Sequence, residues 1–271
     1  MKPPIMAALK IIFLGTCSGT EPYPGCRHVS IAIEADNGLY WFDTGENASY
    51  RAHLDGLNLL ATKAVFISHT HMDHIGGLPN LLWNIRKING ILPPEKRIDG
   101  KTIDVFIPDL GIWSSIMNFL SGTEGDFAIP FNLASHAVAD GVIFNDGVLA
   151  VTALHNRHLE QRDDAWRSFS YRIESKGKVI VWSGDVKSPE EVTPLLDGCD
   201  LLLMETGHHE PAAICDFVLR RRREGIRIGK LLFVHHGRKI LDDLVGQTLA
   251  VKALLGDDAV ITNDGMTLEL L

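Results

Sequence analysis

The residues best suited to chemistry lie in one short stretch of the sequence, FISHTHMDHIGGLP at residues 66–79. An apolar run predicts a strand over residues 64–68, and four residues of metal-binding type follow it directly: His69, His71, Asp73 and His74. Residues two apart in an extended backbone point to the same side, so the first two histidines can bind one ion together. The chain then turns into a predicted helix. The start of this helix directs the aspartate and the third histidine towards a second ion position next to the first. Imidazole and carboxylate together suit zinc or, less selectively, manganese or iron.

This stretch resembles the HxHxDH signature of the metallo-β-lactamase superfamily of dinuclear metal hydrolases. Further motifs of that family follow in order, so the resemblance extends from residues 13–19 to residues 263–270. Asp43, in WFDTGE, resembles the first motif, an aspartate that supports the metal ligands; together with Asp73 it is expected to be essential for catalysis. The metal ligands that the resemblance implies are His69, His71 and His155 for one ion, Asp73, His74 and His235 for the other, and Asp185 shared between them.

Three of the later ligand positions have alternatives in the sequence. His158 lies three residues after His155, but the position at a strand end favours His155. His235 and His236 are adjacent and point apart, so only one should bind, and His235 matches the family position. Asp185 could instead close a strand in a Ser-Gly-Asp turn, although its place after an apolar strand favours a shared ligand.

The expected mechanism follows from the charge of the metals. Two divalent ions about 3.5–4 Å apart lower the pKa of a bridging water, and the resulting hydroxide attacks a phosphoryl or acyl centre. The segment LLLMETGHHEP places Glu205 at a predicted strand end, just before His208 and His209. In the zinc-dependent tRNA 3′-endonucleases of the superfamily, a glutamate and a histidine relay a proton, which implies a pairing of Glu205 with His209 or, alternatively, with His208. The other interpretation is a polar turn before a helix.

The choice of substrate depends on how this chain differs from its nearest branches. The segments 13–34 and 167–185 resemble the tRNA 3′-endonucleases, and Pro24-Gly25-Cys26 also resembles the cyclic phosphodiesterases of phosphonate metabolism. The long basic arm that binds tRNA is replaced by the short mixed-charge segment 156–167. We therefore predict a dinuclear, metal-dependent hydrolase of a small phosphodiester, a cyclic phosphate or a nucleotide. The alternative is hydrolysis of a carbon ester, thioester or lactone; tRNA 3′-processing and a non-catalytic binding module are less favoured.

Composition agrees with an enzyme acting on a small molecule. The 271 residues carry 26 Lys and Arg against 34 Asp and Glu, a net charge of −8, which disfavours structured nucleic acid as a partner. No apolar run approaches the roughly 20 residues of a membrane span, so no membrane partner is expected. Four cysteines without a CxxC pair predict a reducing, cytoplasmic location. A homodimer is the expected assembly.

The elements that must position these residues alternate along the chain. Asn37-Gly38 between two short strands predicts a hairpin, and strands and helices mix throughout. Strands are predicted at 10–14, 29–35, 39–43, 64–68, 105–108, 142–144, 148–153, 168–175, 178–182, 201–205, 231–234 and 267–270. Helices are predicted at 47–56, 75–87, 111–120, 188–196, 211–223 and 242–255. The pattern fits an α/β protein with a four-layer αββα sandwich, the metallo-β-lactamase fold, in one domain over residues 1–271.

Overall fold

Two mixed sheets of seven strands each form the centre of the protein, seen in a computed structural model that describes residues 9–270. In spatial order the first sheet contains β14 (Thr267–Leu270), β1 (Leu9–Gly15), β2 (Ser30–Ala35), β3 (Gly38–Thr44), β4 (Thr62–Phe66), β5 (Thr102–Ile107) and β6 (Asn132–Ala137). The second contains β13 (Ala259–Ile261), β12 (Ile228–His236), β11 (Cys199–Thr206), β10 (Lys178–Trp182), β9 (Phe169–Ser175), β8 (Leu149–His155) and β7 (Gly141–Asn145).

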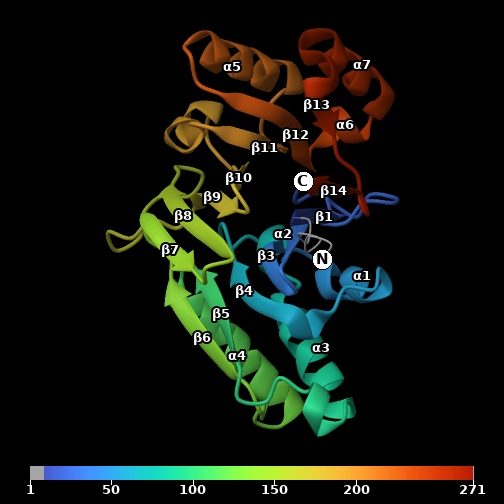
Figure 1. Ribbon diagram of the computed structural model, residues 1–271, viewed down its shortest axis with the longest axis vertical. Coiled ribbons are helices and arrows are strands. Elements are labelled where there is room, and N and C mark those ends of the chain that lie inside the picture. The colour runs from blue at the N-terminus through green and yellow to red at the C-terminus, as the bar shows by residue number, and fades with distance from the viewer. Residues whose placement is uncertain (1–8, 271) are drawn as a thin grey trace, which may run out of the picture.

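Helices cover the outer faces of both sheets (Figure 1). Against the first sheet lie α1 (Ala48–Leu54), α2 (Met72–Ile75), α3 (Leu78–Ile91) and α4 (Leu110–Glu124). Against the second lie α5 (Pro211–Arg223), α6 (Arg238–Leu241) and α7 (Leu244–Leu255). Short 3₁₀ turns occupy Leu59–Ala61, Pro94–Lys96, Pro189–Leu195 and Gly256–Asp258.

The alternation of apolar side chains along the strands explains the layers. In β1, Ile11 and Phe13 face the second sheet, while Ile12 and Leu14 face the helices of the first. Both faces of the central strands are therefore buried, as expected for sheets covered on both sides. Three apolar cores result, one between the sheets and one beneath each helical layer. This arrangement confirms the predicted αββα sandwich.

The carboxyl ends of parallel strands bring the chemical residues together. Strands β3, β4 and β5 run parallel in the first sheet, and β10, β11 and β12 run parallel in the second. The residues at and just beyond their ends include Asp43, His69, Asp185, Glu205 and His235. Side chains far apart in the sequence thus meet at one edge of the sandwich.

The structure corrects several predicted elements. The predicted helix 75–87 is two helices, α2 and α3, because the Gly77 N–H bonds the Thr44 carbonyl at 2.8 Å instead of a carbonyl of the helix. The predicted helix 188–196 is a 3₁₀ segment that contains Pro194, which cannot donate a helical hydrogen bond. Strands β6 and β13 were not predicted.

Two broader predictions concern membrane-spanning helices and the number of domains. Among the residues that are described, no helix combines the length and apolar character needed to cross a bilayer. The single domain over residues 1–271 stays a prediction, and its first eight residues and its last residue lie outside the described range.

Candidate metal centre

Three histidines and one aspartate form the first half of a buried cluster. His69 and His158 each place Nε2 3.7 Å from Oδ2 of Asp185, and Nε2 of His158 lies 3.4 Å from Nδ1 of His71. One ligand-type atom from each of the four residues lies within 4.8 Å of the others. His69 is fully buried and His71 is exposed, so the group opens to solvent on the His71 side.

The second half of the cluster contains Asp73, His74 and His235. Oδ2 of Asp73 lies 3.0 Å from Nε2 of His235 and 3.4 Å from Nε2 of His74. The two histidine Nε2 atoms are 3.2 Å apart. His236 points away from this group and bonds the Thr262 carbonyl through Nε2, at 2.8 Å. The structure therefore places His235, and not its neighbour, in the cluster.

The carboxylate of Asp185 lies between the two halves. Its Oδ2 faces His69 and His158, whereas its Oδ1 lies 3.2 Å from Nε2 of His74 and 3.4 Å from Nε2 of His235. Each oxygen thus belongs to a different group. This is the position that the sequence assigns to a carboxylate shared by two ions.

Asp43 lies behind the cluster and fixes one of its histidines. Its carboxylate accepts hydrogen bonds from the Ser68 backbone N–H at 2.7 Å, the Ser68 hydroxyl at 2.8 Å and the Trp182 indole at 3.0 Å. Nδ1 of His74 donates to Asp43 Oδ2 at 2.9 Å, which fixes the orientation of the imidazole and leaves its Nε2 for another partner. The structure therefore gives Asp43 the supporting position that the sequence assigns to it.

The donor set fits divalent cations. Nε2 of His69 and Oδ1 of Asp185 are buried and have no hydrogen-bond partner within residues 9–270. With Nδ1 of His74 bonded to Asp43, the lone pair on Nε2 of a neutral His74 faces Nε2 of His235. Two such nitrogens need a proton or a cation between them. Ligand atoms of one zinc ion lie within about 4.2 Å of each other, because Zn–N and Zn–O bonds are about 2.0–2.2 Å. The individual pairs of ligand-type atoms given above, from 3.0 Å to 3.7 Å apart, satisfy this limit.

The charge of the cluster also favours cations. Burial lowers the pKa of His74, but the carboxylates of Asp185 and Asp43 outweigh it and raise that pKa well above its ordinary value. Burial raises the pKa of Asp73, but hydrogen bonds from His235 and His74 hold it far below its usual range. The carboxylates therefore stay ionised and attract positive charge into a buried site.

His155 does not join the cluster, which corrects its predicted role as a ligand. It is the last residue of β8 and pairs with Phe169, so its ring stays at the strand end, where Nδ1 lies 2.6 Å from Oδ2 of Asp140. His158 takes the expected place because Asn156 turns the chain, its Oδ1 accepting a hydrogen bond from the His158 backbone N–H at 3.2 Å. The sequence carried this signal in the Asn two residues before His158.

The structure places His208, rather than His209, in hydrogen-bonding contact with Glu205. Glu205 is fully buried, and its carboxylate accepts from the backbone N–H and from Nδ1 of His208, each at 3.0 Å. His208 Nδ1 also lies 3.8 Å from Oδ2 of Asp185. His209 turns away and bonds the Val186 carbonyl through Nε2 at 3.0 Å, although this atom remains 3.4 Å from Glu205. Hydrogen bonding to Glu205 raises the pKa of His208.

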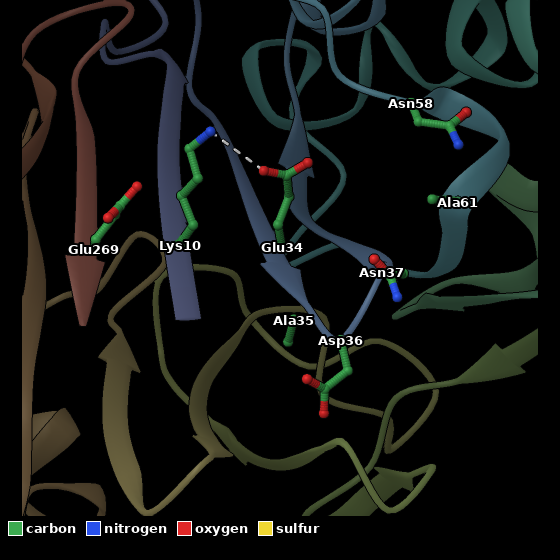
Figure 2. A pocket seen from close by; sticks show the side chains of 9 residues that line it. Lys10, Glu34, Ala35, Asp36, Asn37, Asn58, Ala61 and Glu269 are labelled. Carbon is green, nitrogen blue, oxygen red and sulfur yellow. Dashed lines mark ion pairs between the residues drawn. The ribbon is translucent and has the colours of Figure 1, made fainter. Parts of the chain in front are cut away.

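A cavity at the other end of the first sheet takes no part in this arrangement. Figure 2 shows this cavity, about 370 Å³ in volume, with Lys10 at the start of β1 and Glu34 near the end of β2. The Lys10 ammonium lies 3.4 Å from the Glu34 carboxylate. Strand β1 runs from this cavity towards the loop that contains Gly19, which packs against Asp73 of the cluster, so the cavity lies at the opposite end of the strand.

Comparison with known proteins decides the family. Residues 40–236 match the family model described as Beta-lactamase superfamily domain. The chain belongs to this superfamily. The resemblance to metallo-β-lactamase proteins seen in the sequence is thereby confirmed.

Relatives and solved structures agree with the assignment. Ribonuclease Z of Picrophilus torridus is 32% identical over 175 residues, 65% of this chain and 50% of that protein. Ribonuclease Z of Listeria monocytogenes serotype 4a is 30% identical over 191 residues, 69% of this chain and 56% of that protein. The chain thus spans about half the length of the curated relatives it matches.

Three solved structures are similar to this protein over almost its whole length. The metallo-beta-lactamase fold protein YhfI from Bacillus subtilis has a TM-score of 0.71 and 16% identity, covering 97% of this chain and 100% of that one. The short form of human tRNase Z has a TM-score of 0.67 and 18% identity, with coverage of 96% and 98%. A diphosphatase from the PhnP family has a TM-score of 0.65 and 16% identity, with coverage of 97% and 98%. At these identities the likeness shows the fold.

Proposed function

We propose that this superfamily member is a metal-dependent hydrolase that cleaves a phosphodiester in a small molecule or nucleotide, cyclic phosphates included. Two divalent cations, zinc by preference, would be held by the two halves of the cluster. His69, His71 and His158 would hold one, Asp73, His74 and His235 the other, and Asp185 both. When bound, such a pair lowers the pKa of a water molecule and polarises the substrate oxygens.

The single observation that carries the proposal is the His208–Glu205 pair at the edge of the cluster. The leaving alkoxide of a phosphodiester needs a proton, and an imidazolium beside the cluster can donate it. The buried Glu205 carboxylate orients the His208 ring through Nδ1 and favours its protonated form. The other ring nitrogen, Nε2, is left to contact the substrate, since the His208 side chain is 45% exposed. A hydrolase of activated esters would have no use for this donor.

A small substrate is favoured over a structured RNA. The net charge of −8 opposes association with a long polyanion. Between His155 and Ser168 the chain has only a short segment, held close to the body of the protein by the Leu159 N–H to Ser168 hydroxyl bond at 3.0 Å. The ribonuclease Z relatives and the diphosphatase of similar fold agree with phosphorus chemistry.

Turnover of bis(p-nitrophenyl) phosphate by protein loaded with zinc or manganese tests the proposal, with Asp185→Ala as the blank. Activity that the variant loses supports a metal-dependent phosphodiesterase. Absence of diester turnover by protein that binds two metal ions, together with hydrolysis of thioesters or lactones, would reject the phosphodiester assignment.

A comparison of leaving groups tests the proton donor separately. p-Nitrophenolate leaves without a proton, whereas a ribose alkoxide of a 2′,3′-cyclic nucleotide does not. We expect His208→Ala to lower kcat on the cyclic nucleotide by about 10²–10⁴-fold, the usual contribution of general acid catalysis, and to affect the nitrophenyl diester much less. His209→Ala is the matched control because it changes the adjacent histidine, which bonds a backbone carbonyl. Equal losses on both substrates would contradict the role of His208.

A further inference from the structure

A cavity of about 570 Å³ lies between α4 and the segment 162–167 and has no part in the chemistry described so far. The first turns of α4 form one wall and the segment 162–167 forms the other. We propose that this cavity binds a nucleoside-sized substituent of the phosphodiester and so selects nucleotide substrates. The inference rests on the proposed function and specifies the substrate class of the same site.

Both walls of the cavity belong to chain segments that run next to the cluster. Strands β4 and β5 are parallel, with Phe66 opposite Phe106, so the chain after β5 leaves the sheet next to the chain that carries His69. On the other wall, Ser168 forms a β-bridge with His69, so Arg167 is adjacent in the chain to the residue that pairs with a member of the cluster. A substrate with its phosphorus at the metal centre can therefore extend into this cavity.

The wall formed by residues 162–167 is held in a fixed conformation. Arg162 and Ala165 exchange two backbone hydrogen bonds of 3.0 and 2.9 Å, and the two residues between them have φ values of 50° and 61°. Such positive values at both central positions define a tight hairpin turn. Arg167 Nε donates to the Glu160 carbonyl at 2.9 Å, which closes the base of the hairpin.

His155, which lies outside the cluster, supports the wall formed by residues 162–167. The ring of His155 stacks on Trp166, with centroids 4.1 Å apart and an interplanar angle of 11°. Asp140 holds His155 in place through both its backbone N–H at 2.7 Å and Nδ1 at 2.6 Å. This gives the segment a rigid contact outside the cavity, so the wall is preformed before a ligand binds.

The lining indicates the chemistry of the ligand. Leu110 and Ile112 are 42% and 37% exposed at the start of α4, an apolar surface suited to a planar ring. Arg167 uses only Nε, and its two terminal nitrogens have no hydrogen-bond partner among the described residues, so they can donate to ring or carbonyl acceptors.

Charge decides between a base and a second phosphate. The lining contains Arg162 and Arg167 but also Asp109 and Asp163, so its formal charge is zero. Asp109 is committed to capping α4, its Oδ1 accepting from the Gly111 N–H at 2.7 Å, and Asp163 is 96% exposed. A neutral cavity with apolar walls and arginine donors favours a nucleobase with its sugar over a further anionic group.

Two substrates with the same leaving group test this inference. Thymidine 5′-(p-nitrophenyl phosphate) and methyl p-nitrophenyl phosphate differ only in the retained substituent. We expect kcat/KM for the thymidine ester to exceed that for the methyl ester by at least about tenfold, because the base buries apolar surface against Leu110 and Ile112 and can accept hydrogen bonds from Arg167. Ser115→Trp, which fills the cavity, should abolish this ratio and leave turnover of the methyl ester unchanged.

Ser114→Trp is the matched control. Ser114 and Ser115 are both exposed on α4, and each hydroxyl bonds the carbonyl four residues earlier, but only Ser115 lines the cavity. A ratio near one in the unmodified protein, or equal ratios in the two tryptophan variants, would overturn the inference.

A binding measurement separates this inference from the proposed function. If the metal-loaded protein hydrolyses neither diester, the proposed function fails. Calorimetric titration with thymidine 5′-monophosphate then tests by itself whether the cavity binds a nucleoside. Affinity that Ser115→Trp lowers at least about tenfold and Ser114→Trp preserves would support nucleoside binding. Equal affinity in both variants, or no binding, would overturn it.

Discussion

Truncation of two histidines three residues apart should separate metal binding from structural support. His158→Ala removes a nitrogen that lies 3.7 Å from Asp185 Oδ2 in the cluster. His155→Ala removes a ring that stacks on Trp166 and bonds Asp140 at the end of β8. The two variants make the same chemical change on one segment, so each controls for the other.

The expected magnitudes follow from these contacts. Loss of a residue that merely supports a ligand costs about 10–100-fold in metal affinity, so loss of a ligand at His158 should cost at least about 100-fold. By linkage, a 100-fold weaker affinity removes about 2.7 kcal/mol of metal-dependent stabilisation. His155→Ala should instead destabilise the protein by about 1–3 kcal/mol with or without metal, through the lost stacking and hydrogen bond.

Thermal unfolding with and without zinc, together with metal analysis after dialysis, measures both effects. We expect His158→Ala to keep the melting temperature of the metal-free protein but to lose most of the increase that zinc produces. His155→Ala should show a melting temperature lower by about 2–4 °C per kcal/mol but keep the zinc-dependent increase. The reverse pattern, with metal lost on truncation of His155 and retained on truncation of His158, would refute the assignment.

Three further changes test other parts of the centre. Asp43→Asn should lower metal affinity about 10–100-fold in a chelator competition, because an amide cannot accept all the hydrogen bonds that the carboxylate does; unchanged affinity would contradict its supporting role. Gly207→Ala should displace the His235 ring, since a Cβ would lie 2.6 Å from its Nδ1, and so weaken metal binding, whereas Gly122→Ala has open space and should not. Burial lowers the pKa of His236 to about 4, so the unfolded chain binds more protons between about pH 6.5 and pH 4 and stability falls as the pH drops. In metal-free protein, His236→Gln should remove about 3 kcal/mol of this loss in the free energy of unfolding, measured by chemical denaturation at several pH values. The same pH dependence in the variant as in the unmodified protein would contradict the burial argument.

Much of the fold could be predicted because the strands are strongly apolar and the turns carry clear signals. The strand 178–182 and the helix 211–223 match β10 and α5 residue for residue. Strand β6 was not predicted, because its sequence, NLASHA, lacks the apolar alternation of the other strands. The strand lies at the exposed edge of the sheet. Strand β13 has only three residues, too few for an alternating pattern.

The ligand positions could be predicted only where the strand itself fixes them. His69 follows the end of β4 by three residues, Asp185 follows β10 by three, and His158 follows β8 by three. The prediction ended this strand at residue 153 and so placed His155 just beyond it, whereas β8 continues to His155 itself. Strand boundaries are the least certain part of a prediction from sequence, and here an error of two residues at the end of β8 exchanged one histidine for another.

The choice between His208 and His209 could not be made from sequence because it depends on a tertiary contact. Both follow Glu205 closely enough to reach its carboxylate. However, the ring of His209 forms a hydrogen bond with the Val186 carbonyl, on the segment that carries Asp185. His208 is then left to face the cluster, with Nδ1 on Glu205.

Glu205 connects the proposed proton donor to the metal centre. Strands β11 and β12 are parallel, with Glu205 opposite Val234, so the next residue on β12, His235, comes within reach of the same carboxylate. Oε2 of Glu205 lies 3.7 Å from Nδ1 of His235, while Oε1 holds Nδ1 of His208. Burial raises the pKa of Glu205, but the hydrogen bond from His208 and the nearby His235 imidazole outweigh this and lower it to about 2, so the carboxylate stays charged at any pH where the enzyme would work. One buried charge therefore orients the proposed proton donor, His208, and faces the ligand-type His235, because two parallel strands end side by side.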